Sequence, residues 1–239
     1  MYSIGKGRGI GGALRHALQG ESFIRHIGND KLIFDFHEGS GTVCYDKSHN
    51  SNNGTFGAEA AAPTWQRNSL YFDGIDDYVN CGLNGLPSPS TEITIALWVK
   101  PVEGKNTSII IANPDDTVNR FNMHFPYSDN IIYWDYGNDI STSGRLSVQF
   151  KDSWFNVMAH FVFISSTSGQ KIYRNSILIA SDPTYSAFTK GTKTLDIARY
   201  APTLTYWKGT IDEVRIISKD LSGIECQQEY LANKFRGNN

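Results

Sequence analysis

The sequence predicts an all-β protein, either a sandwich or a barrel of short strands, on the strength of three observations. Its 239 residues include 13 Phe, 12 Tyr and 5 Trp, while charged residues make up only 19%, so a substantial apolar core can form. Short runs alternate between apolar and polar residues. Turn-forming residues, among them 22 Gly, separate these runs.

Period-two alternation is clearest in two segments. In the first, Ile93, Ile95, Leu97 and Val99 alternate with Thr94, Ala96, Trp98 and Lys100. In the second, the alternating apolar residues are Phe155, Val157, Ala159, Phe161 and Phe163. Such patterns predict strands with one face on a core. Further strands are expected at 32–36, 70–72, 78–81, 109–112, 121–125, 131–134, 146–150, 171–174, 177–181, 195–198 and 209–217.

Local signals predict one hairpin and one helix. Asn175 and Ser176 separate two strand-like runs, and a two-residue turn needs the positive φ that Asn tolerates. Near the end of the chain, Ser222 and Glu225 have the spacing of a capping box, which predicts a helix over 222–235.

The charge balance excludes some classes of partner. The formal net charge is −2 and the isoelectric point is about 6.3, so no overall attraction to nucleic acid or anionic membranes is expected. The sequence contains no run of 18 apolar residues, so a membrane-spanning helix is not predicted, and residues 1–20 lack the apolar stretch of a secretory signal.

The cysteines predict free thiols, because Cys44, Cys81 and Cys226 are odd in number and widely spaced.

Residues 1–30 differ from the remainder, 31–239, because they are rich in glycine and basic residues and cannot build a core. We interpret them as an arm that anchors the domain to other subunits. Its expected anchoring residues are Arg8, Leu14, Arg15 and Leu18.

Several separated motifs occur in the order seen in a known family. They are LIFDFHEGSGT (32–42), the Asn-Gly-Thr at 53–55, LYFDGIDDYVNCG (70–82), ITIALWVKP (93–101), IYRNSILIA (172–180) and GTIDEVRI (209–216). In this the chain resembles the laminin-G-like, concanavalin A-like jelly-roll family, particularly its bacterial and phage-encoded members. The resemblance implies a two-sheet sandwich and leaves the function open, because such folds serve many functions.

The family resemblance also implies a structural calcium ion at one edge of the sandwich. Its members use an aspartate after the first strand, the following loop and the aspartate of the last long strand. The corresponding residues here are Asp46, Asn53, Thr55 and Asp212. The loop offers the hard oxygen ligands that calcium prefers, although a polar turn bonded to its own backbone is the alternative. Asp73, Asp76 and Asp77 form a second acidic cluster, which we interpret as a turn, with a second metal site as the alternative.

Carbohydrate binding is the chemistry that the remaining residues favour. Aromatic faces that stack on sugars and polar groups that contact hydroxyls occur together in one stretch, namely Tyr133, Trp134, Asp135, Tyr136, Asn138 and Arg145. The aromatic residues around 201–205 are a weaker candidate. Catalysis is not expected, since the paired carboxylates of related glycan-cleaving sandwiches, an HExxH motif and a GxSxG motif do not occur.

These inferences predict a non-enzymatic attachment protein. A family that usually acts outside cells occurs here without a signal peptide, which favours display on a particle released by lysis, most plausibly a phage virion. The arm then predicts assembly partners and a homo-oligomer, with contact to glycans as a further role. The alternative is a free or secreted calcium-dependent carbohydrate-binding module, located outside the cell or at its surface.

Overall fold

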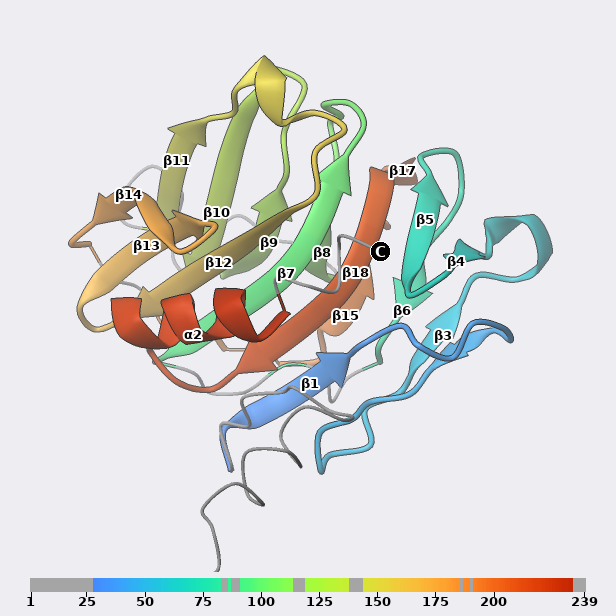
Figure 1. The fold of residues 1–239 in the computed structure, drawn as a ribbon, viewed down its shortest axis with the longest axis horizontal. Helices are drawn as coiled ribbons and strands as arrows, with labels where there is room; N and C mark the ends of the chain where they lie inside the picture. The colour runs from blue at the N-terminus through green and yellow to red at the C-terminus, as the bar shows by residue number, and fades with distance from the viewer. Residues whose placement is uncertain are drawn as a thin grey trace, which may run out of the picture.

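The computed structural model describes residues 28–82, 86, 91–113, 119–137, 144–184, 187–189 and 191–233. The expected anchors Arg8, Leu14, Arg15 and Leu18 lie outside these residues, as does Asn138. Two large antiparallel sheets pack face to face, as Figure 1 shows, so the predicted all-β sandwich is confirmed. We call the sheet that contains β7 the front sheet and the one that contains β10 the back sheet.

The front sheet has the strand order β14-β13-β12-β7-β18-β5-β4, and β1 also pairs with β18. Its strands are β1 Asp30–Phe34, β4 Thr64–Gln66, β5 Ser69–Asp73, β7 Ile93–Pro101, β12 Ala159–Ser166, β13 Gly169–Arg174, β14 Ile177–Asp182 and β18 Lys208–Ile217. The back sheet has the order β11-β10-β9-β8-β15-β6-β3-β2. Its strands are β2 Val43–Cys44, β3 Gly54–Phe56, β6 Val79–Asn80, β8 Ile110–Asn113, β9 Arg120–His124, β10 Ile131–Gly137, β11 Arg145–Gln149 and β15 Thr194–Ile197.

Smaller elements complete the described chain. They are the short hairpin of β16 Arg199–Tyr200 and β17 Thr205–Tyr206, the 3-10 helices η1 Glu59–Ala61 and η2 Asp152–Trp154, and the helix α2 Gly223–Asn233. Within the residues that the structure describes, no helix has the length and apolar character needed to cross a membrane.

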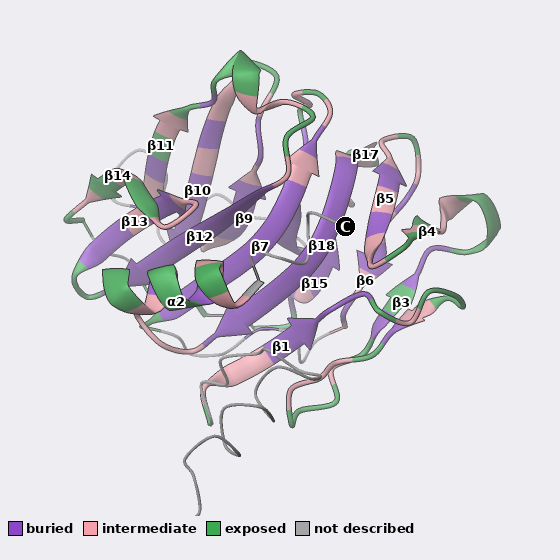
Figure 2. Cartoon of the chain, in the orientation of Figure 1, coloured by how far each residue is buried: buried purple, intermediate pink, exposed green. Residues whose placement is uncertain are grey.

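Apolar side chains from both sheets fill the space between them, and Figure 2 shows the central strands almost wholly buried. Strand β7 is buried on both of its faces, because α2 covers the outer face of the front sheet (Figure 1). There Trp98 stacks on Tyr230 of α2, with ring centroids 5.7 Å apart. The predicted free thiols are also confirmed, since all three cysteines are unpaired and buried.

The capping box forms as predicted at the start of α2. The Ser222 backbone N–H donates to Glu225 Oε2 at 2.9 Å, and the Glu225 N–H donates to Ser222 Oγ at 3.3 Å. The predicted hairpin forms as well, with φ of 48° at Asn175 and 66° at Ser176.

One predicted strand begins later than its pattern indicated. Phe155 and Val157 alternate with the residues of β12 but precede it, because Asn156 adopts φ of 59° and donates its N–H to the carbonyl of Pro101. A residue in this left-handed conformation interrupts an extended strand. The apolar alternation therefore continues beyond the strand that it predicts.

Candidate functional site: a polar pocket on the back sheet

A pocket opens on the outer face of the back sheet, and alternation along β9 supplies its floor. Phe121 and Met123 point into the core between the sheets, so the residues between and beside them face outward. Those residues are Arg120, Asn122 and His124, and all three line the pocket. Its volume is about 260 Å³, and the remaining lining residues are Asn106, Tyr127, Tyr133, Arg145 and Tyr200.

A buried carboxylate fixes the two arginines of the pocket. Asp135 has no exposed surface, and its Oδ1 and Oδ2 accept bonds from Arg145 Nε at 2.5 Å and Nη2 at 2.7 Å. Arg120 Nη1 lies 3.1 Å from Asp135 Oδ2. Strand register explains the arrangement, because Asp135 pairs directly with Arg145 on β11 and with Asn122 on β9. A fork of this kind holds a guanidinium group in one orientation.

Three aromatic rings pack edge to face beside these charges. The ring centroids of His124 and Tyr127 are 4.8 Å apart, and those of Tyr127 and Tyr133 are 6.0 Å apart. Arg145 lies over the Tyr133 ring at 4.4 Å, and the Tyr133 hydroxyl donates to Asp129 Oδ2 at 2.7 Å. The Tyr133 ring is therefore held at both its face and its hydroxyl.

His124 is neutral in this pocket. Burial is the main cause that lowers the pKa of its imidazole, and it outweighs the hydrogen bond to Thr107 and the nearby Asp135, which raise the pKa. The Nδ1 atom lies 2.9 Å from the Thr107 carbonyl oxygen, so Nδ1 carries the proton and Nε2 is an acceptor.

Asn122 brings a donor that is not used within the described part of the chain. Its Oδ1 accepts a bond from the Ser108 hydroxyl, while its buried Nδ2 has no hydrogen-bond partner there. An unpaired buried donor is costly, and an oxygen atom of a ligand in the pocket would reduce this cost.

The structure divides the residues predicted to bind carbohydrate. Tyr133, Asp135 and Arg145 come together at the pocket. Trp134 and Tyr136 were wrong as contact residues, because they alternate with the pocket residues on β10 and are fully buried between the sheets.

Sequence reasoning missed Asn106, Arg120, Asn122 and His124. The three residues on β9 alternate with Phe121 and Met123, so the signal for an outward polar face was present in the sequence. Tyr200 belonged to the weaker aromatic candidate, and it lines the same pocket from the β16–β17 hairpin.

A second cavity adjoins the pocket. The second cavity has a volume of about 420 Å³, and Asn106 lines both the pocket and this cavity. The β16–β17 hairpin contributes Leu204, Thr205 and Tyr206 to its lining. Trp207, by contrast, is fully buried and donates its indole N–H to the carbonyl of Phe125.

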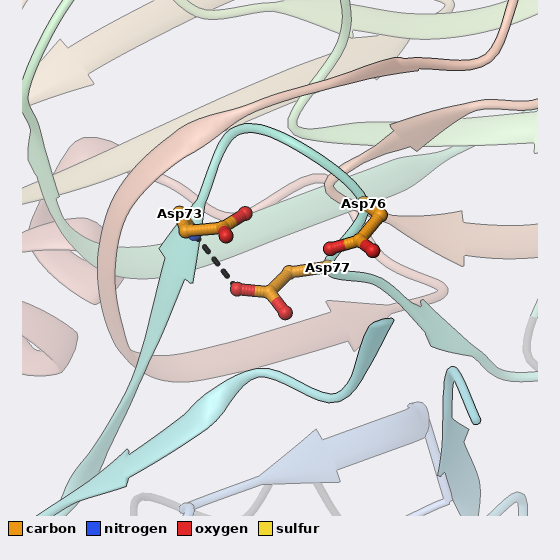
Figure 3. A group of neighbouring side chains, drawn as sticks. All are labelled: Asp73, Asp76 and Asp77. Atoms are coloured by element: carbon orange, nitrogen blue, oxygen red, sulfur yellow. Dashed lines mark hydrogen bonds between the residues drawn. The ribbon is translucent and has the colours of Figure 1, made fainter. Parts of the chain in front are cut away.

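The acidic cluster forms a turn, as interpreted from sequence. Figure 3 shows that the carboxylates of Asp73, Asp76 and Asp77 converge, with oxygens within 4.8 Å of one another. The Asp73 N–H donates to Asp77 Oδ2 at 2.8 Å, and Gly74 has φ of 78°. Burial is the main cause that raises the pKa of Asp77 to about 6, with the neighbouring carboxylates adding to it.

Asp46, the main expected calcium ligand, already has four hydrogen-bond donors. Oδ1 accepts from the N–H groups of Ile33 at 2.9 Å and Ser48 at 2.8 Å. Oδ2 accepts from the Ser48 hydroxyl at 2.7 Å and the Asn52 N–H at 2.8 Å. A carboxylate has about four acceptor positions, so this loop conformation does not fit Asp46 as a calcium ligand.

The other expected ligands have separate roles. Asn53 Oδ1 accepts a hydrogen bond from the Asp46 N–H at 3.0 Å, and Thr55 of β3 pairs with Val43 of β2. Asp212 is buried in β18, where the pairing with β7 shifts register between Ile211 and Glu213. Calcium binding stays a prediction.

Comparison with known proteins bears on the family and on the fold. A family model described as the concanavalin A-like lectin/glucanases superfamily matches residues 72–226. No curated protein matches the sequence significantly.

Solved structures share the fold at low sequence identity. The botulinum neurotoxin serotype D binding domain superposes with a TM-score of 0.64 and 15% identity over 87% of this chain and 52% of that one. A structure of botulinum neurotoxin type C superposes with a TM-score of 0.61 and 13% identity over 85% of this chain and 51% of that one. Cell entry of that toxin is described as dependent on interaction with two ganglioside molecules. A Trypanosoma rangeli sialidase in complex with a difluoro-nononic acid superposes with a TM-score of 0.60 and 13% identity over 87% of this chain and 34% of that one. The chain thus spans about half the length of the toxin structures.

Proposed function

The chain belongs to the concanavalin A-like lectin/glucanase superfamily, and from this premise we propose that it is a carbohydrate-binding domain whose ligand occupies the pocket on the back sheet. The observation that carries the proposal is the combination of aromatic rings with fixed polar groups in one concave site. Tyr127 and Tyr133 offer apolar ring surface, while Arg145 and the buried Asn122 offer hydrogen-bond donors whose positions the sheet fixes. Sugars present the same two kinds of surface to a protein.

The structural neighbours support a glycan as the class of ligand. Cell entry of the type C neurotoxin is described as dependent on interaction with two ganglioside molecules, and the sialidase structure holds a difluoro-nononic acid. Because identity to these proteins is below 16%, the likeness extends to the fold, and the ligand is our inference from the pocket.

Binding rather than catalysis fits the charges of the pocket. Most enzymes that hydrolyse a glycosidic bond use two carboxylates that flank the bond. Among the described residues, Asp135 is the carboxylate that contacts the pocket arginines, and both its oxygens are bonded to Arg145. It is therefore placed to orient Arg145 rather than to exchange protons with a substrate.

A glycan array followed by titration calorimetry on the purified chain tests the proposal. We expect at least one glycan to bind, and Tyr133→Ala to weaken it at least tenfold, since stacking area would be lost. Tyr45→Ala is the matched control, because Tyr45 is 53% exposed and is not among the pocket residues. An array without binding, or equal loss in both variants, would contradict the proposal.

Attachment to a virion through residues 1–30, with assembly into an oligomer, stays a prediction from sequence. Those residues fall almost wholly outside the described part of the chain. A carbohydrate-binding domain is compatible with display on a particle and with secretion, so the pocket does not distinguish the two.

A further inference from the structure

The pocket and the second cavity share residues and hydrogen bonds. Asn106 lines both of them. On the β16–β17 hairpin, Tyr200 lines the pocket, while its strand partner Thr205 lines the second cavity. Thr107 contacts both sides, since its hydroxyl donates to the Thr205 carbonyl at 3.0 Å and its own carbonyl oxygen lies 2.9 Å from His124 Nδ1. The two cavities therefore lie side by side with common walls.

The pocket alone is small for a ligand site. Its volume of about 260 Å³ lies below the range of roughly 300–1,000 Å³ that is usual for small-molecule pockets, and the second cavity of about 420 Å³ brings the combined space within that range. A ligand that extends from the pocket into the second cavity therefore has more surface in contact with the protein than a single sugar confined to the pocket.

Asn106 places a hydrogen-bond donor at the junction of the two cavities. Its Oδ1 accepts a bond from the hydroxyl of Ser128, which also lines the second cavity. This bond orients the amide, and the described part of the chain shows no acceptor bonded to Asn106 Nδ2. The side chain is exposed, so this N–H group is open to a ligand. A donor in this position suits a hydroxyl or ring oxygen of a ligand that passes from one cavity to the other.

Apolar side chains from two separate segments line the second cavity. Leu204 of the β16–β17 hairpin is 66% exposed, and Ile75 of the turn after β5 is 72% exposed. Tyr206 adds an aromatic ring to the same lining. The apolar face of a sugar ring that covers these side chains would remove apolar surface from water, which favours binding.

Hydrogen bonds connect the walls of the second cavity. Lys105 Nζ donates to the Gly74 carbonyl at 2.8 Å, so the loop after β7 is bonded to the turn that contains Ile75. The Thr107 hydroxyl bonds the same loop to the hairpin through Thr205. Because these bonds already hold the walls together, a ligand loses less of its binding energy to the ordering of loops.

We propose that the ligand is an oligosaccharide of two or more sugar rings that occupies both cavities. One ring lies against Tyr127 and Tyr133 in the pocket, and the next lies against Leu204 and Ile75 in the second cavity. Asn106 Nδ2 donates to an oxygen of the ligand where the two cavities meet. This inference rests on the proposed function and names chain length as the property by which the site selects its ligand.

Saccharides of increasing length provide the test, titrated into the purified chain by calorimetry. The probes are glucose, cellobiose and cellotriose; N-acetylglucosamine, chitobiose and chitotriose; and galactose, lactose and lacto-N-tetraose. The glycan that binds best on the array is added together with its own shorter fragments. We expect affinity in at least one series to rise about tenfold or more from the monosaccharide to the longer members, because linked rings fill adjoining sites together.

Variants assign this gain to the second cavity. Leu204→Ala should weaken binding of the longer saccharide about fivefold or more, because apolar contact is lost, and should leave the monosaccharide affinity unchanged. Tyr133→Ala should weaken both, since its ring lines the pocket. Leu231→Ala is the matched control, because Leu231 is a leucine of α2 that is 51% exposed and lines neither cavity. Thermal unfolding of each variant verifies that it is folded.

The outcomes separate this inference from the proposed function. Equal affinity for short and long saccharides, or long-saccharide binding that Leu204→Ala leaves unchanged in a folded protein, would overturn the extended ligand while leaving carbohydrate binding in the pocket intact. An array without binding, together with no binding in any series, would overturn both.

Discussion

Arg215 on β18 and Glu229 on α2 form an ion pair in the interior of the protein, with Nη1 and Oε2 2.6 Å apart and each side chain only 1% exposed. The same guanidinium group reaches Asp30 at the start of β1, where Nη2 lies 2.9 Å from Oδ1. One arginine on the long strand β18 thereby connects the first described strand to the last described helix.

Removing one partner from this buried pair should destabilise the fold strongly. Glu229→Ala leaves the Arg215 charge with less compensation, and we expect the free energy of unfolding to fall by about 3–5 kcal/mol. Urea denaturation measures this quantity. The matched control is Glu103→Ala, which breaks surface pairs with Lys105 at 3.4 Å and Lys208 at 3.7 Å and should cost under about 1 kcal/mol. Equal losses of unfolding free energy in the two variants would contradict the larger contribution expected from the buried pair.

A buried histidine beneath the same helix predicts loss of stability in acid. Burial is the main cause that lowers the pKa of His160 to about 3, and the nearby positive charge of Arg215 adds to it. His160 is neutral when folded but titrates near its ordinary pKa when unfolded, so the unfolded state binds more protons below about pH 6.5. Stability is then complete above that pH and decreases as the pH falls toward 3.

The expected loss from His160 is about 2 kcal/mol between pH 7 and pH 5. Asp77, with its raised pKa, acts in the opposite direction between about pH 4 and pH 6, so the wild type alone does not isolate the histidine. His160→Gln does, because only one titrating group differs between the two proteins. Urea unfolding at a series of pH values should give a shallower acid decline for the variant, and parallel curves would contradict this account.

A glycine in the first back-sheet hairpin offers a test of packing. A Cβ on Gly54 would lie 2.6 Å from Val79 Cγ1 and 3.0 Å from Phe34 Cζ, so Gly54→Ala should cost about 1–3 kcal/mol through overpacking. Gly223→Ala is the control, because its Cβ would meet only the Tyr173 hydroxyl at an ordinary 3.6 Å. Thermal unfolding compares the two, and a harmless Gly54→Ala would contradict this packing.

Local signals in the sequence predicted most of the fold. Alternation identified β7 and most of β12, and the turn at Asn175 and the cap at Ser222 were specified by residues within three positions of each other in the chain. Alternation fails where a residue such as Asn156 interrupts the strand while the apolar pattern continues. A pattern reports which face is apolar, and the backbone conformation decides where the strand begins.

The pocket was only partly predictable, because its residues are far apart in the sequence. Tyr133 and Arg145 lie in one aromatic stretch, whereas Asn106 comes from a distant loop and Tyr200 from the β16–β17 hairpin. Trp134 and Tyr136 were predicted as contact residues because they are aromatic, without regard to which face of β10 each one occupies. Side chains alternate along a strand, so an outward-facing Asp135 places Trp134 and Tyr136 in the core.

The calcium prediction is decided by the loop that follows β2. Asp46→Ala removes the acceptor for two backbone N–H groups of the loop and for that of Ile33, and we expect a loss of about 1–3 kcal/mol. Because these donors already contact both carboxylate oxygens, the thermal midpoint of the wild type should be the same in EDTA and in excess calcium. Glu59→Ala, an exposed acidic residue outside this loop, is the control. A midpoint that calcium raises in the wild type and in Glu59→Ala, but not in Asp46→Ala, would instead establish that the loop opens its hydrogen bonds to hold the ion.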